Sequence, residues 1–142
     1  MIQRIDHVGI AVHSIDEARR FYESLGLTVA EIEEVPQEGV RVAMIVCGES
    51  RIELLEATRP DSPIAKHLEK RGPGLHHLCL GSSDVRGDDL ALRETGATLL
   101  RPEPTRGAGG CWVQFVHPKS AGGVLVELSE APAHGHAGAP PH

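Results

Sequence analysis

The sequence is poor in aromatic residues, cysteine pairs and long apolar runs, and each shortage argues against a class of protein. One Trp, one Tyr and two Phe among 142 residues leave little to line an aromatic groove for a sequestered ligand. The three cysteines, odd in number and without a C-x-x-C pair, argue against a disulfide framework or a zinc knuckle. Because no run of 18 apolar residues occurs, we expect neither export nor a membrane span.

A cluster of positive charge is also lacking. The net charge is -6, and the 14 Lys and Arg residues are scattered, so nucleic acid is not expected as a partner. The remaining composition, 40% hydrophobic and 24% charged, is typical of a globular protein with an aliphatic core. With this length, we expect one cytoplasmic domain over residues 1–130.

The chain repeats one pattern of elements. An alternating strand at residues 5–12 precedes a helix that begins with a capping box at Ser14 and ends at Gly26. In the second half, a strand at residues 75–80 precedes a helix that ends at Gly96. Three β-rich runs, bounded by turn signals, follow each helix: residues 27–32, 40–47 and 51–55, then 97–100, 111–116 and 124–129.

The two halves also agree in register, since His7 precedes Gly26 by 19 residues and His77 precedes Gly96 by the same number. We therefore predict an α+β fold, in which two βαβββ modules at about residues 3–58 and 74–130 form a curved mixed sheet around a metal site. Ser62 and Pro63 predict a linker helix at about residues 63–71. Residues 131–142 lack periodicity and predict a disordered tail, whose His134, His136 and His142 are weak metal candidates.

Two histidines and two glutamates occupy equivalent places in the modules. His7 and His77 lie in the first strands, and Glu53 and Glu127 lie in the last strands between aliphatic neighbours. Because side chains alternate along a strand, all four point away from the predicted core face and toward an open face. In the first strand the core face carries Val8, Ile10 and Val12. Taken singly, each is a plausible solvated residue; their recurrence in both modules favours a divalent ion bound by all four.

The nitrogen and oxygen ligands of this set suit Co, Mn, Ni, Fe, Zn or Mg. We interpret the remaining histidines of the two modules and the linker as structural or solvated: His13, His67, His76 and His117.

Several segments resemble the vicinal oxygen chelate superfamily and, within it, the methylmalonyl-CoA epimerases. The resemblance covers nearly all of residues 3–130. It is carried by residues 5–11 (IDHVGIA), 34–40 (EVPQEGV), 54–56 (LLE), 61–66 (DSPIAK), 74–78 (GLHHL) and 117–127 (HPKSAGGVLVE).

The resemblance implies a glyoxalase-like fold, a homodimer and an acyl-CoA substrate. Its reaction is the interconversion of (2R)- and (2S)-methylmalonyl-CoA, in which a C2 proton is removed and returned through a metal-stabilised enolate. In some epimerases a glutamate in the strand after the QEGV stretch serves one face of C2, but Val42 stands there in this chain. We therefore hypothesise that Glu53 and Glu127 share the proton transfer, with Glu38 and Glu49 as fallbacks.

The CoA portion of the substrate is expected to contact a glycine-rich loop and a lysine. These would supply backbone donors and positive charge, although an ordinary glycine hairpin and an exposed lysine explain the same pattern. The candidate residues are Arg106, Gly109, Gly110 and Lys119.

Three rival functions fit parts of the pattern. A glyoxalase I-like isomerase acting on a glutathione hemithioacetal uses the same ligand types, but the segments above resemble the epimerases. A ring-cleaving iron dioxygenase requires two His and one carboxylate, so the fourth ligand, Glu53, argues against it. A metal-free small-molecule-binding protein of the same fold would need the aromatic residues that this chain lacks.

Overall fold

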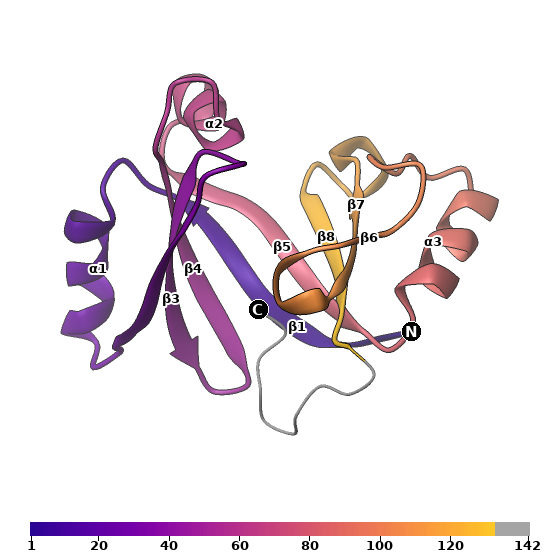
Figure 1. The fold of residues 1–142 in the computed structure, drawn as a ribbon, viewed down its shortest axis with the longest axis horizontal. Coiled ribbons are helices and arrows are strands. Elements are labelled where there is room, and N and C mark those ends of the chain that lie inside the picture. The colour runs from indigo at the N-terminus through magenta and orange to yellow at the C-terminus, as the bar shows by residue number, and fades with distance from the viewer. Residues whose placement is uncertain (133–142) are drawn as a thin grey trace. The chain divides into compact units, whose positions relative to one another are not determined.

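The computed structural model describes residues 1–132, which fall into two compact units (Figure 1). The first unit is His7–His76, and the second consists of Met1–Asp6 together with the chain from His77 onward. The chain changes units inside two strands, β1 (Ile2–Ala11) and β5 (Gly74–Ser82). In the second unit, the N–H of Ser83 donates to the carbonyl of Met1 at 3.0 Å.

Ala131 and Pro132 have no regular structure, and the rest of the predicted tail, with His134, His136 and His142, lies outside the described residues.

The first unit has the strand order β2-β3-β4-β1, with β1 parallel to β4 and the other neighbours antiparallel. Two helices accompany this sheet, and both begin at the caps that the sequence predicts, Ser14 and Ser62. Gly26, at a φ of 87°, follows the first helix as predicted. The elements are α1 (Ile15–Ser24), β2 (Val29–Val35), β3 (Val40–Cys47), β4 (Ser50–Ala57) and α2 (Pro63–Arg71).

The second unit repeats this arrangement with the strand order β5-β8-β7-β6, and β5 is parallel to β8. The prediction of an α+β fold with two βαβββ modules is therefore confirmed. No helix within the described chain is long and apolar enough to cross a membrane. The elements are α3 (Val85–Glu94), β6 (Thr105–Arg106), β7 (Trp112–Val116) and β8 (Leu125–Glu130), with short 3₁₀ turns η1 (Ala108–Gly110) and η2 (Pro118–Ser120).

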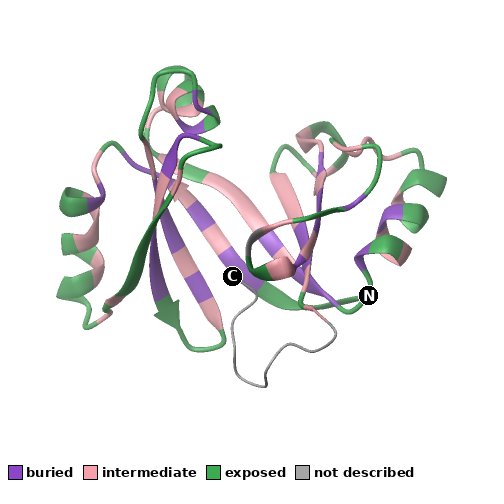
Figure 2. Cartoon of the chain, in the orientation of Figure 1, coloured by how far each residue is buried: buried purple, intermediate pink, exposed green. Residues whose placement is uncertain are grey.

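Both faces of the central strand β4 carry buried side chains, and it is purple and pink along its length in Figure 2. The predicted core face packs against α1, because Val12, Leu54 and Ile15 belong to one apolar cluster. The opposite face was predicted to be open, and this was wrong. Helix α2 covers part of it, since Ile64 packs with Ala11, Leu55 and Val40, and His7 is only 1% exposed.

The predicted strand at residues 97–100 is reduced to one bridge, from Leu99 to Val116. Two backbone hydrogen bonds flank it, from Leu100 to Phe115 and from His117 to Thr98, both at 2.8 Å. The paired strand β6 comes later. Arg93 of α3 donates to the carbonyls of Arg101 and Pro102, both at 2.8 Å. These carbonyls are therefore bonded to a side chain rather than to a neighbouring strand.

A buried polar network in the second unit fixes the same loop. Gln114, fully buried, donates to Asp89 at 2.7 Å and to the carbonyl of Arg101 at 3.0 Å. Arg93 donates to the other oxygen of Asp89 at 2.9 Å. Burial raises the pKa of Asp89, but the hydrogen bonds from Arg93 and Gln114 and the charge of Arg93 outweigh it and leave this pKa below its usual value.

We expect Asp89→Asn to lower the free energy of unfolding by about 1–3 kcal/mol at pH 7, because it weakens a buried charge-assisted network. Since the folded pKa of Asp89 is depressed, its stabilising effect is present above the unfolded pKa and is lost as the pH falls through the folded pKa. Urea unfolding of both proteins from pH 7 to pH 3 measures this. A difference that stays constant or grows toward pH 3 would contradict the assignment.

The last strand of each unit is tied to the start of that unit's helix by a glutamate. Glu56 accepts a hydrogen bond from the N–H of Ile15 at 2.7 Å, and Glu130 accepts one from the N–H of Val85 at 2.8 Å. Ile15 and Val85 are the first residues of their helices, and the N–H of a first residue has no partner within the helix. A carboxylate at this end also interacts favourably with the helix dipole. Neither of these two caps is among the features predicted from the sequence.

We expect Glu56→Ala and Glu130→Ala each to lower the free energy of unfolding by about 1–2 kcal/mol, because each leaves a helix N–H without its acceptor. Chemical denaturation is the measurement. The matched variants Glu56→Gln and Glu130→Gln keep an acceptor oxygen and should lose less than half as much. Equal losses for Ala and Gln would show that the hydrogen bond to the helix is not the stabilising contact.

Candidate metal centre

The first unit contains one close His–Glu pair. Nε2 of His7 on β1 lies 3.5 Å from Oε1 of Glu53 on β4. The parallel register makes Gly9 the Cα partner of Glu53, so Glu53 lies diagonal to His7 on the same face. Both side chains are buried, at 1% and 7% exposure.

The second unit contains the equivalent pair with the same geometry. Nε2 of His77 on β5 lies 3.5 Å from Oε1 of Glu127 on β8, and the two side chains are 10% and 13% exposed. Here the Cα partner of Glu127 is Cys79, which takes the place that Gly9 has in the first unit. The repeat therefore brings each histidine next to the glutamate of its own unit.

The spacing within each pair suits two ligands of one ion. A direct N–H···O hydrogen bond has a donor–acceptor distance of about 2.7–3.2 Å, and 3.5 Å exceeds it. Two ligand atoms that are each about 2.1 Å from a metal are about 3.0–3.4 Å apart in octahedral or tetrahedral geometry. A buried imidazole and a buried carboxylate at this separation fit a divalent cation.

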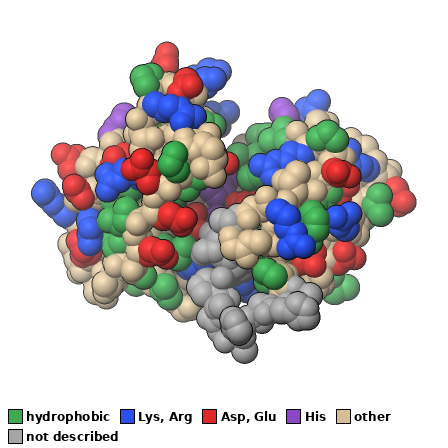
Figure 3. Space-filling view, in the orientation of Figure 1, with side chains coloured by type: hydrophobic (Ala, Val, Ile, Leu, Met, Phe, Trp, Pro, Cys, Tyr) green, Lys and Arg blue, Asp and Glu red, His purple; other side chains and the backbone are tan. Residues whose placement is uncertain are grey.

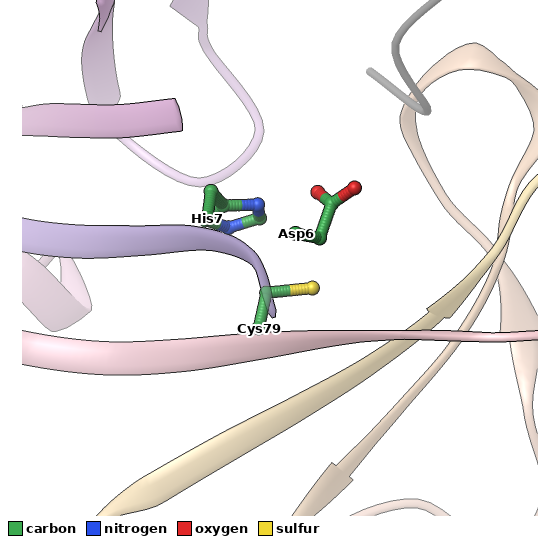
Figure 4. Close-up of side chains that lie close together, drawn as sticks. All are labelled: Asp6, His7 and Cys79. Atoms are coloured by element: carbon green, nitrogen blue, oxygen red, sulfur yellow. The ribbon is translucent and has the colours of Figure 1, made fainter. Parts of the chain in front are cut away.

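Two further buried side chains of the second unit carry ligand atoms (Figure 4). A carboxylate oxygen of Asp6 and Sγ of Cys79 lie within 4.8 Å of each other, and Asp6 also accepts from Arg4 at 3.0 Å. Neither residue is among the ligands predicted from the sequence. The available signals were the Asp-His dipeptide at residues 6–7 and the spacing of two residues that puts Cys79 on the same strand face as His77.

The alternative acids do not accompany the first pair. Val42 lies in β3, two residues from Met44, the Cα partner of Glu53. An aliphatic side chain therefore occupies the position that a glutamate has in some epimerases. Glu38 and Glu49 both lie in exposed turns, one between β2 and β3 and the other between β3 and β4.

The residues suggested for CoA contact lie in the second unit. Arg106 of β6 donates to the carbonyl of Gly110 at 2.7 Å, and the N–H of Gly110 donates to the carbonyl of Gly107 at 3.1 Å. The glycine loop thus uses some of its own backbone donors. Gly109, with a φ of 67°, belongs to the same loop, and Lys119 of η2 is exposed.

The remaining histidines have structural or exposed positions. The rings of His67 and His76 are 5.0 Å apart at an angle of 78°. Burial and the nearby His67 lower the pKa of His76 to about 4, so its ring is neutral at pH 7. His117 accepts from the N–H of Lys119 at 3.0 Å, and His13 is exposed.

Comparison with known proteins identifies the class to which this fold and these pairs belong. Residues 6–115 match the model of the Glyoxalase/Bleomycin resistance protein/Dioxygenase superfamily, and the chain is a member of it. Within that superfamily it belongs to the family of methylmalonyl-CoA epimerases and is an isomerase.

Three relatives illustrate the match. The chain is 41% identical to the ethylmalonyl-CoA/methylmalonyl-CoA epimerase of Cereibacter sphaeroides, over 92% of this chain and 99% of the relative. It is 39% identical to the mitochondrial methylmalonyl-CoA epimerase of Homo sapiens, over 90% and 74%. The structure of a Streptomyces coelicolor methylmalonyl-CoA epimerase variant in complex with 2-nitronate-propionyl-CoA superposes with a TM-score of 0.84, at 40% identity, over 94% of this chain and 100% of that one.

Proposed function

We propose that this protein interconverts (2R)- and (2S)-methylmalonyl-CoA. The matched relatives that carry this activity in their names align over nearly the whole chain. The main structural support is the recurrence of one His–Glu pair, with the same 3.5 Å spacing, in both units. A homodimer and a cytoplasmic location stay predictions.

The proposal includes one divalent metal ion with His7, Glu53, His77 and Glu127 as its ligands, two from each unit. Two neutral imidazoles and two carboxylates would balance the charge of such an ion. When bound, it would act as a Lewis acid toward the thioester carbonyl and so make the C2 proton more acidic. The nitrogen and oxygen ligands suit Co, Mn, Ni, Fe, Zn or Mg.

The protein's own part in the reaction is to hold C2 between two proton-transfer groups. Inversion requires a base on one face of C2 and an acid on the other. Val42 cannot exchange a proton, and Glu38 and Glu49 are exposed turn residues. We therefore assign the exchange to Glu53 and Glu127. A carboxylate has two oxygens, so one can serve as a ligand while the other exchanges a proton.

The reaction is tested by incubating one epimer of methylmalonyl-CoA with metal-loaded protein in deuterated water. We expect deuterium at C2 together with racemisation, because reprotonation draws on solvent. A parallel incubation with methylglyoxal and glutathione tests the glyoxalase I-like alternative. Lactoylglutathione formation without C2 exchange would overturn the proposal.

Metal binding is tested by calorimetric titration of metal-free protein with Co²⁺. We expect one ion per chain, and His7→Ala and His77→Ala should each weaken binding at least tenfold because each removes a ligand. His13→Ala, which removes an exposed histidine, is the control. Two ions per chain would mean that each pair binds its own ion, and no binding would favour the metal-free alternative.

The role of Glu53 is tested by Glu53→Gln, with metal content measured beside activity. Gln keeps an oxygen ligand but cannot accept the C2 proton, so we expect exchange to fall at least a hundredfold while the ion is retained. Glu56→Gln, three residues along the same strand, is the matched control. Unchanged exchange in Glu53→Gln would remove this residue from the proton transfer.

A further inference from the structure

The single tryptophan of the chain lies between two arginines. The guanidinium carbon of Arg86, on α3, and that of Arg106, on β6, each lie 4.3 Å from the Trp112 ring. Both arginines are exposed, and Trp112 is half-buried. Over the second unit as a whole, Lys and Arg side chains are interspersed with Asp and Glu side chains (Figure 3). We call these three residues the Arg–Trp–Arg stack.

Carboxylates do not neutralise the stack. Within the described part of the chain, neither Arg86 nor Arg106 forms an ion pair with an acid, and the hydrogen bond from Arg106 goes to the carbonyl of Gly110. Arg86 also lies in the first turn of α3, where the helix dipole disfavours a cation. The two guanidinium charges beside one ring repel each other, and a bound anion would offset this repulsion.

The repeat shows that the fold does not require this stack. In the first unit Arg41 is the Cα partner of Glu56 and pairs with it at 3.3 Å. In the second unit Trp112 is the Cα partner of Glu130. Both glutamates cap a helix, so the same structural task is carried out in the first unit without an aromatic ring or a second arginine.

The stack also lies within reach of the proposed centre. Glu130 follows Glu127 by three residues, which is about 10 Å along a strand, and Trp112 is directly opposite Glu130. Trp112 faces the α3 side of the sheet, opposite to Glu127, and only the two-residue edge strand β6 lies beyond β7. To join the two sites, the arm between a CoA thioester and its diphosphate would have to run around this edge.

We propose that the Arg–Trp–Arg stack binds the phosphorylated nucleotide end of the acyl-CoA substrate, an inference that rests on the proposed function. The two guanidiniums would donate to the phosphate oxygens, and the stacking on Trp112 would hold their planes fixed for bidentate contacts. The stack determines substrate affinity rather than the chemistry at C2.

Binding can be measured without catalysis, because Trp112 is the only tryptophan and its fluorescence reports directly on the stack. The probe is adenosine 3′,5′-bisphosphate, with inorganic phosphate and dephospho-CoA as comparisons, and calorimetry as a second readout. We expect saturable binding of the bisphosphate and an increase in Kd of about tenfold in Arg86→Ala and in Arg106→Ala. Arg20→Ala, an exposed arginine of α1, is the matched control and should bind normally.

Kinetics then connect the stack to the reaction. Arg86→Ala and Arg106→Ala should raise KM for methylmalonyl-CoA and leave kcat unchanged, while KM for methylmalonyl-pantetheine, which lacks the nucleotide, should not move. Unchanged bisphosphate Kd in both variants, or equal affinity for inorganic phosphate, would overturn the inference. If the protein binds the bisphosphate through the stack but shows no exchange at C2, the proposed function fails and the nucleotide site stands.

Discussion

The parallel pairing of the first and last strand of each unit is the constraint on which the rest of the structure depends. It places Glu53 diagonal to His7 and Glu127 diagonal to His77. Three residues after each of these glutamates comes a second one that caps the helix of the unit. An odd spacing along a strand puts the two glutamates on opposite faces, so one strand supplies both a candidate metal ligand and an anchor for the helix.

Much of this fold could be predicted because its signals are local. The ends of α1 and α2 follow from caps that lie within a few residues of the helices, such as Ser14 and Ser62. The pairing of each His with its Glu follows from the repeat, although it joins residues about 50 positions apart. What sequence reasoning missed depends on contacts that no local pattern records. Arg93 holds the carbonyls of residues 101 and 102, and α2 covers the face that was expected to be open.

The two units have kept the pairs and diverged around them. Gly9 in the first unit corresponds to Cys79 in the second, and Arg41 corresponds to Trp112. The packing of the helix differs as well, since Tyr22 of α1 corresponds to Leu92 of α3. Leu92 lines an open, largely apolar pocket of about 370 Å³ in the second unit. The two units thus share the His–Glu pairs, while only the second of the two described units carries the Arg–Trp–Arg stack.

The change of units inside β1 has a consequence for the order of folding. Met1–Asp6 belongs to the second unit, where the carbonyl of Met1 accepts from Ser83, 82 residues later, and the side chain of Arg4 packs over Gly81. During synthesis, residues 1–6 can therefore form these contacts only after residues 81–83 have been made. Closing such a long loop slows folding, so the second unit should become structured later than residues 7–76, even though its first residues are synthesised before them.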